Sequence, residues 1–449
     1  MTGDNEISVH QHWDPLKVCA VGRCYPPHFF SRIKNSKVRN AMEKIAIETE
    51  EDYQKLISKL EEFDVTVLRT DISDDPEVYV NDKIPQPLGE GHVTDYPPMV
   101  PRDYTAMIGG TFFMPSRRYG ENIDVRNVFD RLCTSQMSDL THREKLMAKM
   151  LEDILEPQKN LSTSMSLFKF RTQKKYHQGT KVLTGIDFDK IRDEIIKAET
   201  MQIGSPNKCP NSGKFYPYTT IEKWLKDNNV PIVYDQYINT ATSIRCGKDL
   251  YFSFCHVINK LNQKSFDDKL RRLFPDYRIN YLANTGHSDG STCVVKPGLV
   301  VSLKDTENCQ QLFPDWDVCS ISGESWEKVD GFLKMKEKNK GKYFVAGEED
   351  NDDLIEYMDS WLSHWQLYVE ESVFDVNMLV IDENNIICNG YNEKVFKYFE
   401  KHGVTPHIVN FRHRYFWDGG LHCITSDISR EGEQKDYFPD RNYVSDLIA

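Results

Sequence analysis

A hydrophobic share of 39% and a charged share of 28% in a chain of 449 residues are typical of a globular protein with ample apolar material for a core. The formal net charge of -13 would repel a phosphate backbone, and no apolar run approaches the roughly twenty residues that cross a bilayer. Nucleic acid and membranes are therefore poor default partners. The cysteines include no CxxC pair and the first residues have no signal or transit character, so we expect a reduced compartment and a cytoplasmic protein.

Strand-like runs and amphipathic stretches alternate along the chain. The segment 16–25 favours a strand, and 41–63 favours a helix with an apolar stripe at Met42, Ile45, Ile47, Tyr53, Leu56, Ile57 and Leu60. Four later segments place two apolar runs around a short turn, which is the pattern of a β-hairpin. These hairpins are expected at 104–115, 242–253, 291–302 and 376–389, and further helices at 220–229, 265–274 and 393–403.

The alternation predicts an α/β protein of about five strand-and-helix units, without sequence identity between the units. One domain spanning residues 1–449 fits this pattern best. Three polar or proline-rich stretches, near 82–100, 157–181 and 336–354, are expected to be surface insertions. Each is compatible with a lid or a specificity loop, although a solvent-exposed surface loop without a function is the commoner explanation.

The peptide GGLHC places Cys423 directly behind His422 and after a pair of glycines. Glycines let the backbone approach a ligand closely, and a nearby imidazole favours the nucleophilic thiolate. A buried, inert thiol is the commoner role of a cysteine, so this peptide alone leaves both roles open.

A second candidate is the peptide GHSDG, which holds His287 and Asp289 two residues apart. On an extended segment the two side chains would face the same way, so that an acid could bind a planar cation while the imidazole moves protons. A loop histidine beside a turn-forming aspartate is an equally simple interpretation.

A third candidate, Asp103, stands directly before a predicted hairpin, where aspartate is also a common turn residue. The segments of Asp103, Asn239 and the pair His287–Asp289 each open such a hairpin unit. If the units are arranged around an axis, these equivalent ends converge on one cavity.

With these residues in view, the chain resembles the glycine (arginine) amidinotransferases, members of a guanidine-modifying superfamily that includes arginine and agmatine deiminases. The resemblance implies an α/β propeller of five strand-helix modules around a pseudo-fivefold axis. Its motifs occur in family order between about residues 10 and 435. They are HWDPLKVCAVGR, MVPRDYTAMIGG, SIRCGKDLYFS, GHSDGSTCVVKPGLVVS, VNMLVIDENNIICN and GGLHCITSDISREG.

The resemblance also implies roles for individual residues. Cys423 matches the nucleophile that forms a covalent amidino-cysteine, and His287 matches the general acid and base. Asp103 and Asp289 match the carboxylates that grip the guanidinium, and Arg102 of the same PRD motif is assigned to substrate binding with them. The implied reaction moves an amidino group from an arginine-like donor to a primary amine, without cofactor or metal.

Three departures from the family pattern concern the catalytic histidine and the substrate. Asn239 stands where the family has an acid beside the catalytic histidine; an amide orients imidazole but cannot stabilise imidazolium by charge. Thr306 replaces the arginine that binds the substrate carboxylate, and Glu370 and Glu371 replace serines that assist it. Acidic residues there would favour an amine, so we expect a donor other than arginine or an acceptor other than glycine.

Other functions remain open at this level. A deiminase would use the same nucleophile with water as the acceptor, and a catalytically weakened homologue would bind guanidines without turnover. A Cys-His peptidase does not explain the gathered carboxylates. We expect no metal, because His12, His256, His413 and His422 have no companions at ligand spacing. The oligomeric state is open, with a homodimer as one option.

Overall fold

The structure is a computed structural model. It describes residues 7–80, 93, 95–115, 215–235, 238–253, 260–283, 287–304, 306–321, 345, 347–348, 350–362, 365 and 374–441. The predicted surface insertions near 82–100, 157–181 and 336–354 fall wholly or largely outside these residues. Within the described ranges, no helix combines the length and the apolar character that crossing a membrane requires.

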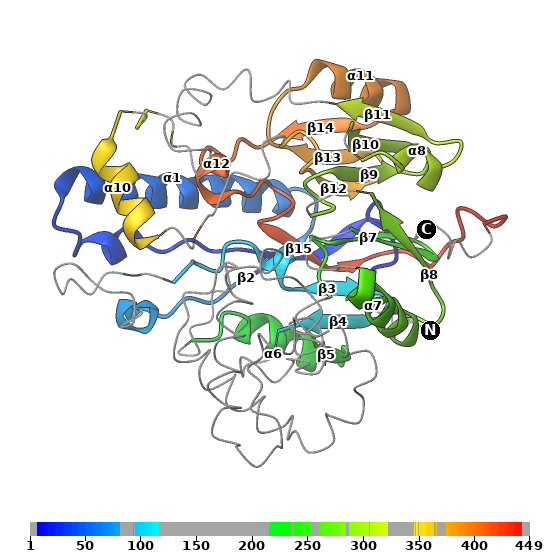
Figure 1. Cartoon of the computed structure of the whole chain (residues 1–449), viewed down its shortest axis with the longest axis horizontal. Helices are drawn as coiled ribbons and strands as arrows, with labels where there is room; N and C mark the ends of the chain where they lie inside the picture. The colour runs from blue at the N-terminus through cyan, green and yellow to red at the C-terminus, as the bar shows by residue number, and fades with distance from the viewer. Residues whose placement is uncertain are drawn as a thin grey trace, which may run out of the picture.

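The described residues form five three-stranded sheets that share one topology. In each sheet the middle strand pairs antiparallel with one neighbour and parallel with the other. A parallel pair requires a crossover connection, and in every sheet a helix lies in that crossover (Figure 1). The chain is therefore an α/β protein, as predicted from the alternation of strands and helices.

Four of the sheets are each built from one stretch of chain. The first comprises β3 (Ala106–Ile108), β4 (Thr111–Met114), α6 (Thr219–Asp227) and β5 (Ile232–Tyr234). The second comprises β6 (Ser243–Cys246), β7 (Asp249–Ser253), α7 (Lys260–Leu273) and β8 (Arg278–Leu282). The third comprises β9 (Thr292–Lys296), β10 (Leu299–Leu303), α8 (Cys309–Leu312) and β11 (Asp317–Ile321). The fourth comprises β12 (Leu379–Asp382), β13 (Asn385–Cys388), α11 (Glu393–His402) and β14 (Thr405–Ile408).

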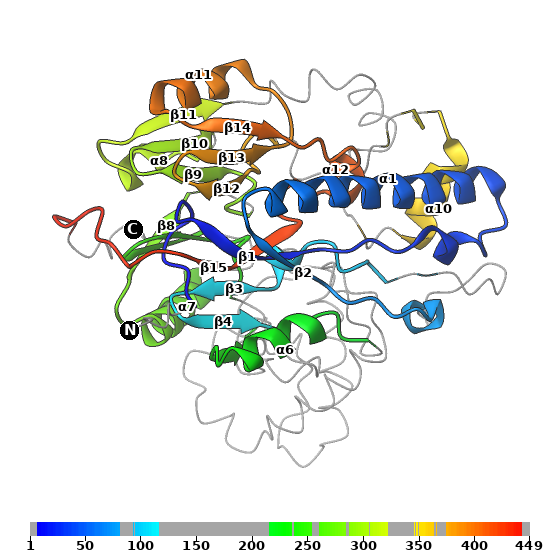
Figure 2. The same ribbon diagram turned by 180° about the vertical axis from the view of Figure 1, so that it is seen from behind.

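The fifth sheet combines segments that are far apart in the sequence. Its central strand β1 (Leu16–Val21) pairs antiparallel with β15 (Thr425–Arg430) and parallel with β2 (Thr66–Arg69), as Figure 2 shows. The long helix α1 (Ser36–Glu61) lies in the crossover between β1 and β2. The remaining elements are η1 (Pro27–Phe30), η2 (Pro76–Tyr79), η3 (Pro101–Asp103), α10 (Asp352–Trp361) and α12 (Arg414–Trp417).

All four predicted hairpins are confirmed. Three of their tight turns use glycines at positive φ, with 55° at Gly109, 62° at Gly247 and 88° at Gly298, a conformation that costs other residues steric strain. At Gly247 a Cβ would lie only 1.9 Å from the carbonyl oxygen of Lys435, so a side chain there would also collide with the backbone. Local turn chemistry thus fixes these strand pairs.

Helix α1 confirms the prediction over 41–63 with one exception. Asn35 caps its first turn by accepting from the backbone N of Lys37, and Met42 and Leu56 are buried in the core. Ile47, which was expected in the apolar stripe, is 47% exposed, so that expectation was wrong. It lies two positions after Ile45, and residues two apart on a helix do not share a face.

Candidate active site

The five segments that precede β3, β6, β9, β12 and β15 are joined in a closed circuit of hydrogen bonds. The backbone N of Ala241 donates to the carbonyl oxygen of Arg102 (3.3 Å), and the N of Asp289 donates to that of Ala241 (3.2 Å). The side chain of Asn377 donates to the carbonyl oxygen of Asp289 (3.3 Å) and accepts from the N of His422 (2.9 Å). Arg102 Nε closes the circuit by donating to the carbonyl oxygen of His422 (2.7 Å).

This circuit brings the predicted nucleophile to one of the predicted acids. Cys423 is 2% exposed, and its thiol donates to Asp289 Oδ2 over 3.4 Å. Asn377 Nδ2 donates to Cys423 Sγ over 2.9 Å. The loop admits this approach because Gly420 has no side chain: a Cβ there would lie 2.6 Å from Asn377 Oδ1. A thiol, a carboxylate and an amide therefore meet at one point.

His422 contacts the same Asp289 oxygen as the thiol. Its Nδ1 lies 2.9 Å from Asp289 Oδ2, and because a carboxylate only accepts, the ring proton must be on Nδ1. Burial, and then the charges of Arg102 and His12, hold the pKa of His422 well below its ordinary value of 6.5. The ring is thus a neutral donor that fixes the Asp289 carboxyl group in orientation.

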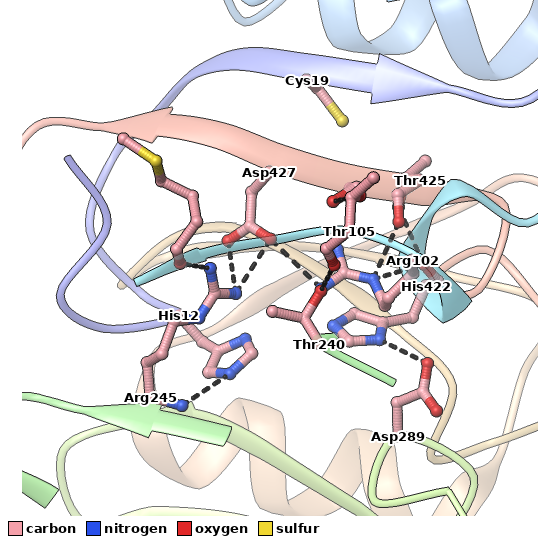
Figure 3. A network of polar contacts seen from close by, with 12 residues as sticks. His12, Cys19, Arg102, Thr105, Thr240, Arg245, Asp289, His422, Thr425 and Asp427 are labelled. Atoms are coloured by element: carbon pink, nitrogen blue, oxygen red, sulfur yellow. Dashed lines mark hydrogen bonds and ion pairs between the residues drawn. The ribbon is translucent and has the colours of Figure 1, made fainter. Parts of the chain in front are cut away.

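A buried ionic cluster lies behind this site (Figure 3). Asp427 on β15 contacts three arginines: Arg245 Nη2 at 2.8 Å, Arg430 Nε at 2.7 Å and Arg102 Nη1 at 3.1 Å. Burial alone would raise the pKa of Asp427, but the three guanidinium groups hold it well below its ordinary value. Three cations face one carboxylate, and their charges add to burial in lowering the pKa of the neighbouring imidazoles of His12 and His422.

The second of these imidazoles, His12, accepts a hydrogen bond through Nε2 from the backbone N of Arg245 (3.2 Å). Burial, followed by the charge of Arg245, holds the pKa of His12 well below 6.5. His12 and His422 line a small cavity together with Asp289 and the hydroxyl groups of Thr240 and Ser288. The cavity is at the lower limit for holding a single water molecule. This cavity is therefore too small to hold a guanidine.

Helix α1 holds the loop that leads to Cys423. Arg412 donates to the buried carboxylate of Asp52 through Nε (2.9 Å) and through its backbone N (2.8 Å). Trp417 Nε1 donates to Thr49 Oγ1 (2.9 Å) inside the core. Both contacts anchor α12, which ends directly before the GGLHC peptide, so the position of the thiol depends on α1.

The pair His287–Asp289 adopts a different conformation from the expected one. The backbone N of Thr292 donates to the carbonyl oxygen of Ser288 (2.7 Å), so the segment is a turn and the extended geometry was wrong. Asp289 points inward to Cys423, whereas His287 is only half-buried. The role of His287 as general acid and base stays a prediction.

The PRD motif forms the short helix η3. Asp103 is half-buried at its end, in a segment that Arg102 ties to the nucleophile loop through hydrogen bonds to the carbonyl oxygens of His422 and Thr425. The Arg102 side chain is 0% exposed and ion-paired with Asp427. This burial favours a positioning role for Arg102 over direct contact with a substrate.

Asn239 belongs to the segment before β6. Its side-chain oxygen accepts from the backbone N and the hydroxyl of Thr242 (3.0 Å each), an arrangement that closes a turn. Within the described residues no hydrogen bond joins Asn239 to His287. Asp235, an acid four residues before Asn239, pairs with Lys269 Nζ at 2.5 Å.

The residues that mark departures in substrate binding are only partly visible. Thr306 is 4% exposed in the turn after β10, where its backbone N donates to the carbonyl oxygen of Leu303 (3.1 Å). Glu370 and Glu371 lie outside the described residues. Their expected effect on substrate choice therefore stays a prediction.

The other described cysteines are buried and differ from Cys423 in their surroundings. Burial raises the pKa of Cys293 to about 12 and that of Cys309 to about 11, and it raises the pKa of Cys388 well above the ordinary value. These thiols fit the prediction that most cysteines act as small apolar side chains.

Comparison with known proteins agrees with the motifs. Over 231 residues, or 50% of the chain, the sequence is 28% identical to mitochondrial glycine amidinotransferase of Xenopus tropicalis, covering 46% of that protein. This chain is similar to glycine amidinotransferases. The chicken (Gallus gallus) amidinotransferase is 27% identical over 232 residues, again covering 50% of the chain and 46% of the relative. The chain thus spans about half the length of the curated amidinotransferases it matches.

The same comparison extends to solved structures. The amidinotransferase SxtG of Microseira wollei, from a saxitoxin biosynthetic pathway, superimposes with a TM-score of 0.47 and 16% identity, over 96% of this chain and 100% of the other. No family model matches the sequence. The resemblance to amidinotransferases indicated by the motifs is confirmed by the curated relatives.

Proposed function

We propose that this protein is an amidinotransferase that moves an amidino group from a guanidino donor to a primary amine through an amidino-cysteine. The observation that carries the proposal is the contact of Cys423 Sγ with the Asp289 carboxylate at 3.4 Å, on a loop that begins with two glycines. If Cys423 were an inert buried thiol, a neighbouring carboxylate would only oppose its ionisation. If Cys423 is a nucleophile, the carboxylate can bind a planar cation and hold it against the sulfur. Similarity to the curated amidinotransferases supports the same chemistry.

In the proposed reaction, Asp289 and Asp103 each accept hydrogen bonds from the guanidinium and hold its central carbon for attack. The Cys423 thiolate forms a C–S bond with that carbon. The C–N bond to the departing amine then breaks as His287 donates a proton to the nitrogen. His287 next removes a proton from the acceptor amine, whose nitrogen attacks the same carbon; the C–S bond breaks and the thiolate is restored.

We further propose that the five sheets are the modules of an α/β propeller around a pseudo-fivefold axis, within one domain that spans 1–449. The shared topology of the sheets and the closed circuit of hydrogen bonds between their leading segments support this arrangement. The pseudo-symmetry would bring Asp103, Asp289 and Cys423 to one cavity although they are far apart in the sequence. The substrates are expected to be small molecules. A cytoplasmic location and a homodimer stay predictions, and the relatives named above are mitochondrial.

The test measures products from L-arginine with and without a panel of primary amines. Transfer predicts ornithine together with a new guanidine only when an amine is present, and it predicts that Cys423→Ala abolishes turnover. The matched control is Cys293→Ala, which removes a nearby buried thiol whose pKa is about 12 and should leave turnover intact. Citrulline formed at the same rate without any amine would contradict transfer and favour a deiminase. Because Thr306 departs from the family pattern, agmatine and other guanidines belong in the donor panel.

A further inference from the structure

A single amide side chain, that of Asn377, contacts the predicted nucleophile through both of its polar atoms. Its Oδ1 accepts from the backbone N of His422 (2.9 Å) and of Cys423 (3.2 Å). Its Nδ2 donates to Cys423 Sγ (2.9 Å) and to the carbonyl oxygen of Asp289 (3.3 Å). Asn377 is 0% exposed, so these contacts are shielded from water. Both links that this segment makes in the circuit run through the Asn377 side chain.

We infer that Asn377 acts on the reacting sulfur, by stabilising the Cys423 thiolate and fixing the direction of Sγ. The inference rests on the proposed role of Cys423 as the nucleophile. A donor N–H favours the charged form of its acceptor, and a neutral donor does so without competing for the cationic substrate. The two backbone contacts hold the loop at the same time, so the sulfur is in place before a substrate arrives.

The charged and titratable groups around the thiol make such a donor necessary. Asp289 lies 3.4 Å from Sγ and opposes its ionisation, and His422 is neutral. The Arg102 guanidinium reaches the loop at the carbonyl oxygen of His422, while its charge is paired with Asp427. Asp103 and His287 belong to adjoining segments of the site. Asn377 is the group with a direct contact that favours the thiolate among the described residues.

The surrounding structure fixes the Asn377 side chain in this position. Asn389 Nδ2 donates to the carbonyl oxygen of Asn377 (2.7 Å), and the Asn377 backbone N donates to that of Phe374 (3.2 Å). Gly420 leaves the space that the amide oxygen fills. A residue held at its backbone and its side chain together is suited to setting an atomic position to within a fraction of an ångström.

The experiment is a pH titration of the thiolate absorbance of Cys423, taken as the difference between each protein and its counterpart carrying Cys423→Ala. In Asn377→Ala the midpoint should rise by about one to two pH units, because a hydrogen bond to an ionised group is lost. In Asn377→Asp it should rise at least as far, since a second acid replaces the donor. The matched control is Asn308→Ala, which removes a buried amide bonded to the carbonyl oxygen of Tyr281 (2.9 Å) and should leave the midpoint unchanged.

A midpoint that stays in place in folded Asn377 variants would overturn the inference and leave the proposed function standing. A wild-type Cys423 that ionises no more readily than the other cysteines would overturn both. If neither variant folds, the wild type labelled with asparagine carrying side-chain 15N decides the question. One amide signal should then move with the ionisation of Cys423 and lose that response in Cys423→Ala; a spectrum without such a signal would refute the contact.

Discussion

Replacing Asp427 by asparagine should destabilise the protein more than any change of a surface charge. The carboxylate compensates Arg245, Arg430 and Arg102, whose side chains are at most 1% exposed. Removing one partner of a buried ionic group leaves uncompensated charge and costs roughly 3–5 kcal/mol. Three guanidinium groups lose their counter-charge at once, so we expect a loss at the upper end of this range. The total free energy of unfolding of a native domain is roughly 5–15 kcal/mol, so this loss would be a large part of it.

The measurement is urea unfolding at pH 7, followed by tryptophan fluorescence and circular dichroism, for the wild type and Asp427→Asn. The matched control is Asp317→Asn, whose carboxylate pairs with Lys401 and His402 near the surface. An exposed pair of this kind contributes under about 1 kcal/mol. Equal, small losses in the two variants would refute the view that Asp427 balances the buried cations.

Two further predictions concern the site. Gly420→Ala should slow the alkylation of Cys423 by iodoacetamide and cost about 1–3 kcal/mol in urea unfolding, because its Cβ would lie 2.6 Å from Asn377 Oδ1. Gly390→Ala, with open space around its Cβ, is the control; equal effects would contradict the steric explanation. Stability should also fall as the pH drops below 6.5, the ordinary pKa of histidine, because burial lowers the pKa of His12 and His422 in the folded state and the unfolded chain binds protons first. Each histidine contributes about 1.4 kcal/mol per pH unit to the fall in the free energy of unfolding. The variant His12→Gln should lose the contribution of one histidine when unfolding is measured from pH 7 to 5.

The sequence predicted the local parts of the fold well, because short-range chemistry determines them. The hairpin turns at Gly109 and Gly298 require positive φ, which glycine adopts without strain, and the strand pairs on both sides follow. The error at Ile47 arose because an apolar residue was assigned to the core by type, although its helical phase points it to solvent. The topology that the sheets share was not predicted, because it depends on the third strand of each sheet, which pairs with a segment distant in the sequence.

Within the candidate site, the residues with reactive groups were easier to predict than those that support them. Cys423 and Asp289 were predicted from their residue types and motifs, and the structure brings them together. Asn377 was missed because an asparagine inside an apolar hairpin sequence gives no chemical signal. Asp427 and Arg430 were missed because residues three apart in a strand are expected on opposite faces, and only the folded chain shows that both are buried and paired. A polar residue within a strand predicted to be central would have been the signal for such a cluster.

The sheet that combines β1, β2 and β15 also determines when the reactive centre can form. β1 is synthesised before the other four sheets and β15 after them, and Cys423 lies only two residues before β15. A nascent chain can thus assemble every other sheet while the thiol is still unsupported or inside the ribosome. Under the proposed function, catalysis would begin only once β15 pairs with β1, so an incomplete chain released early would not react with guanidines.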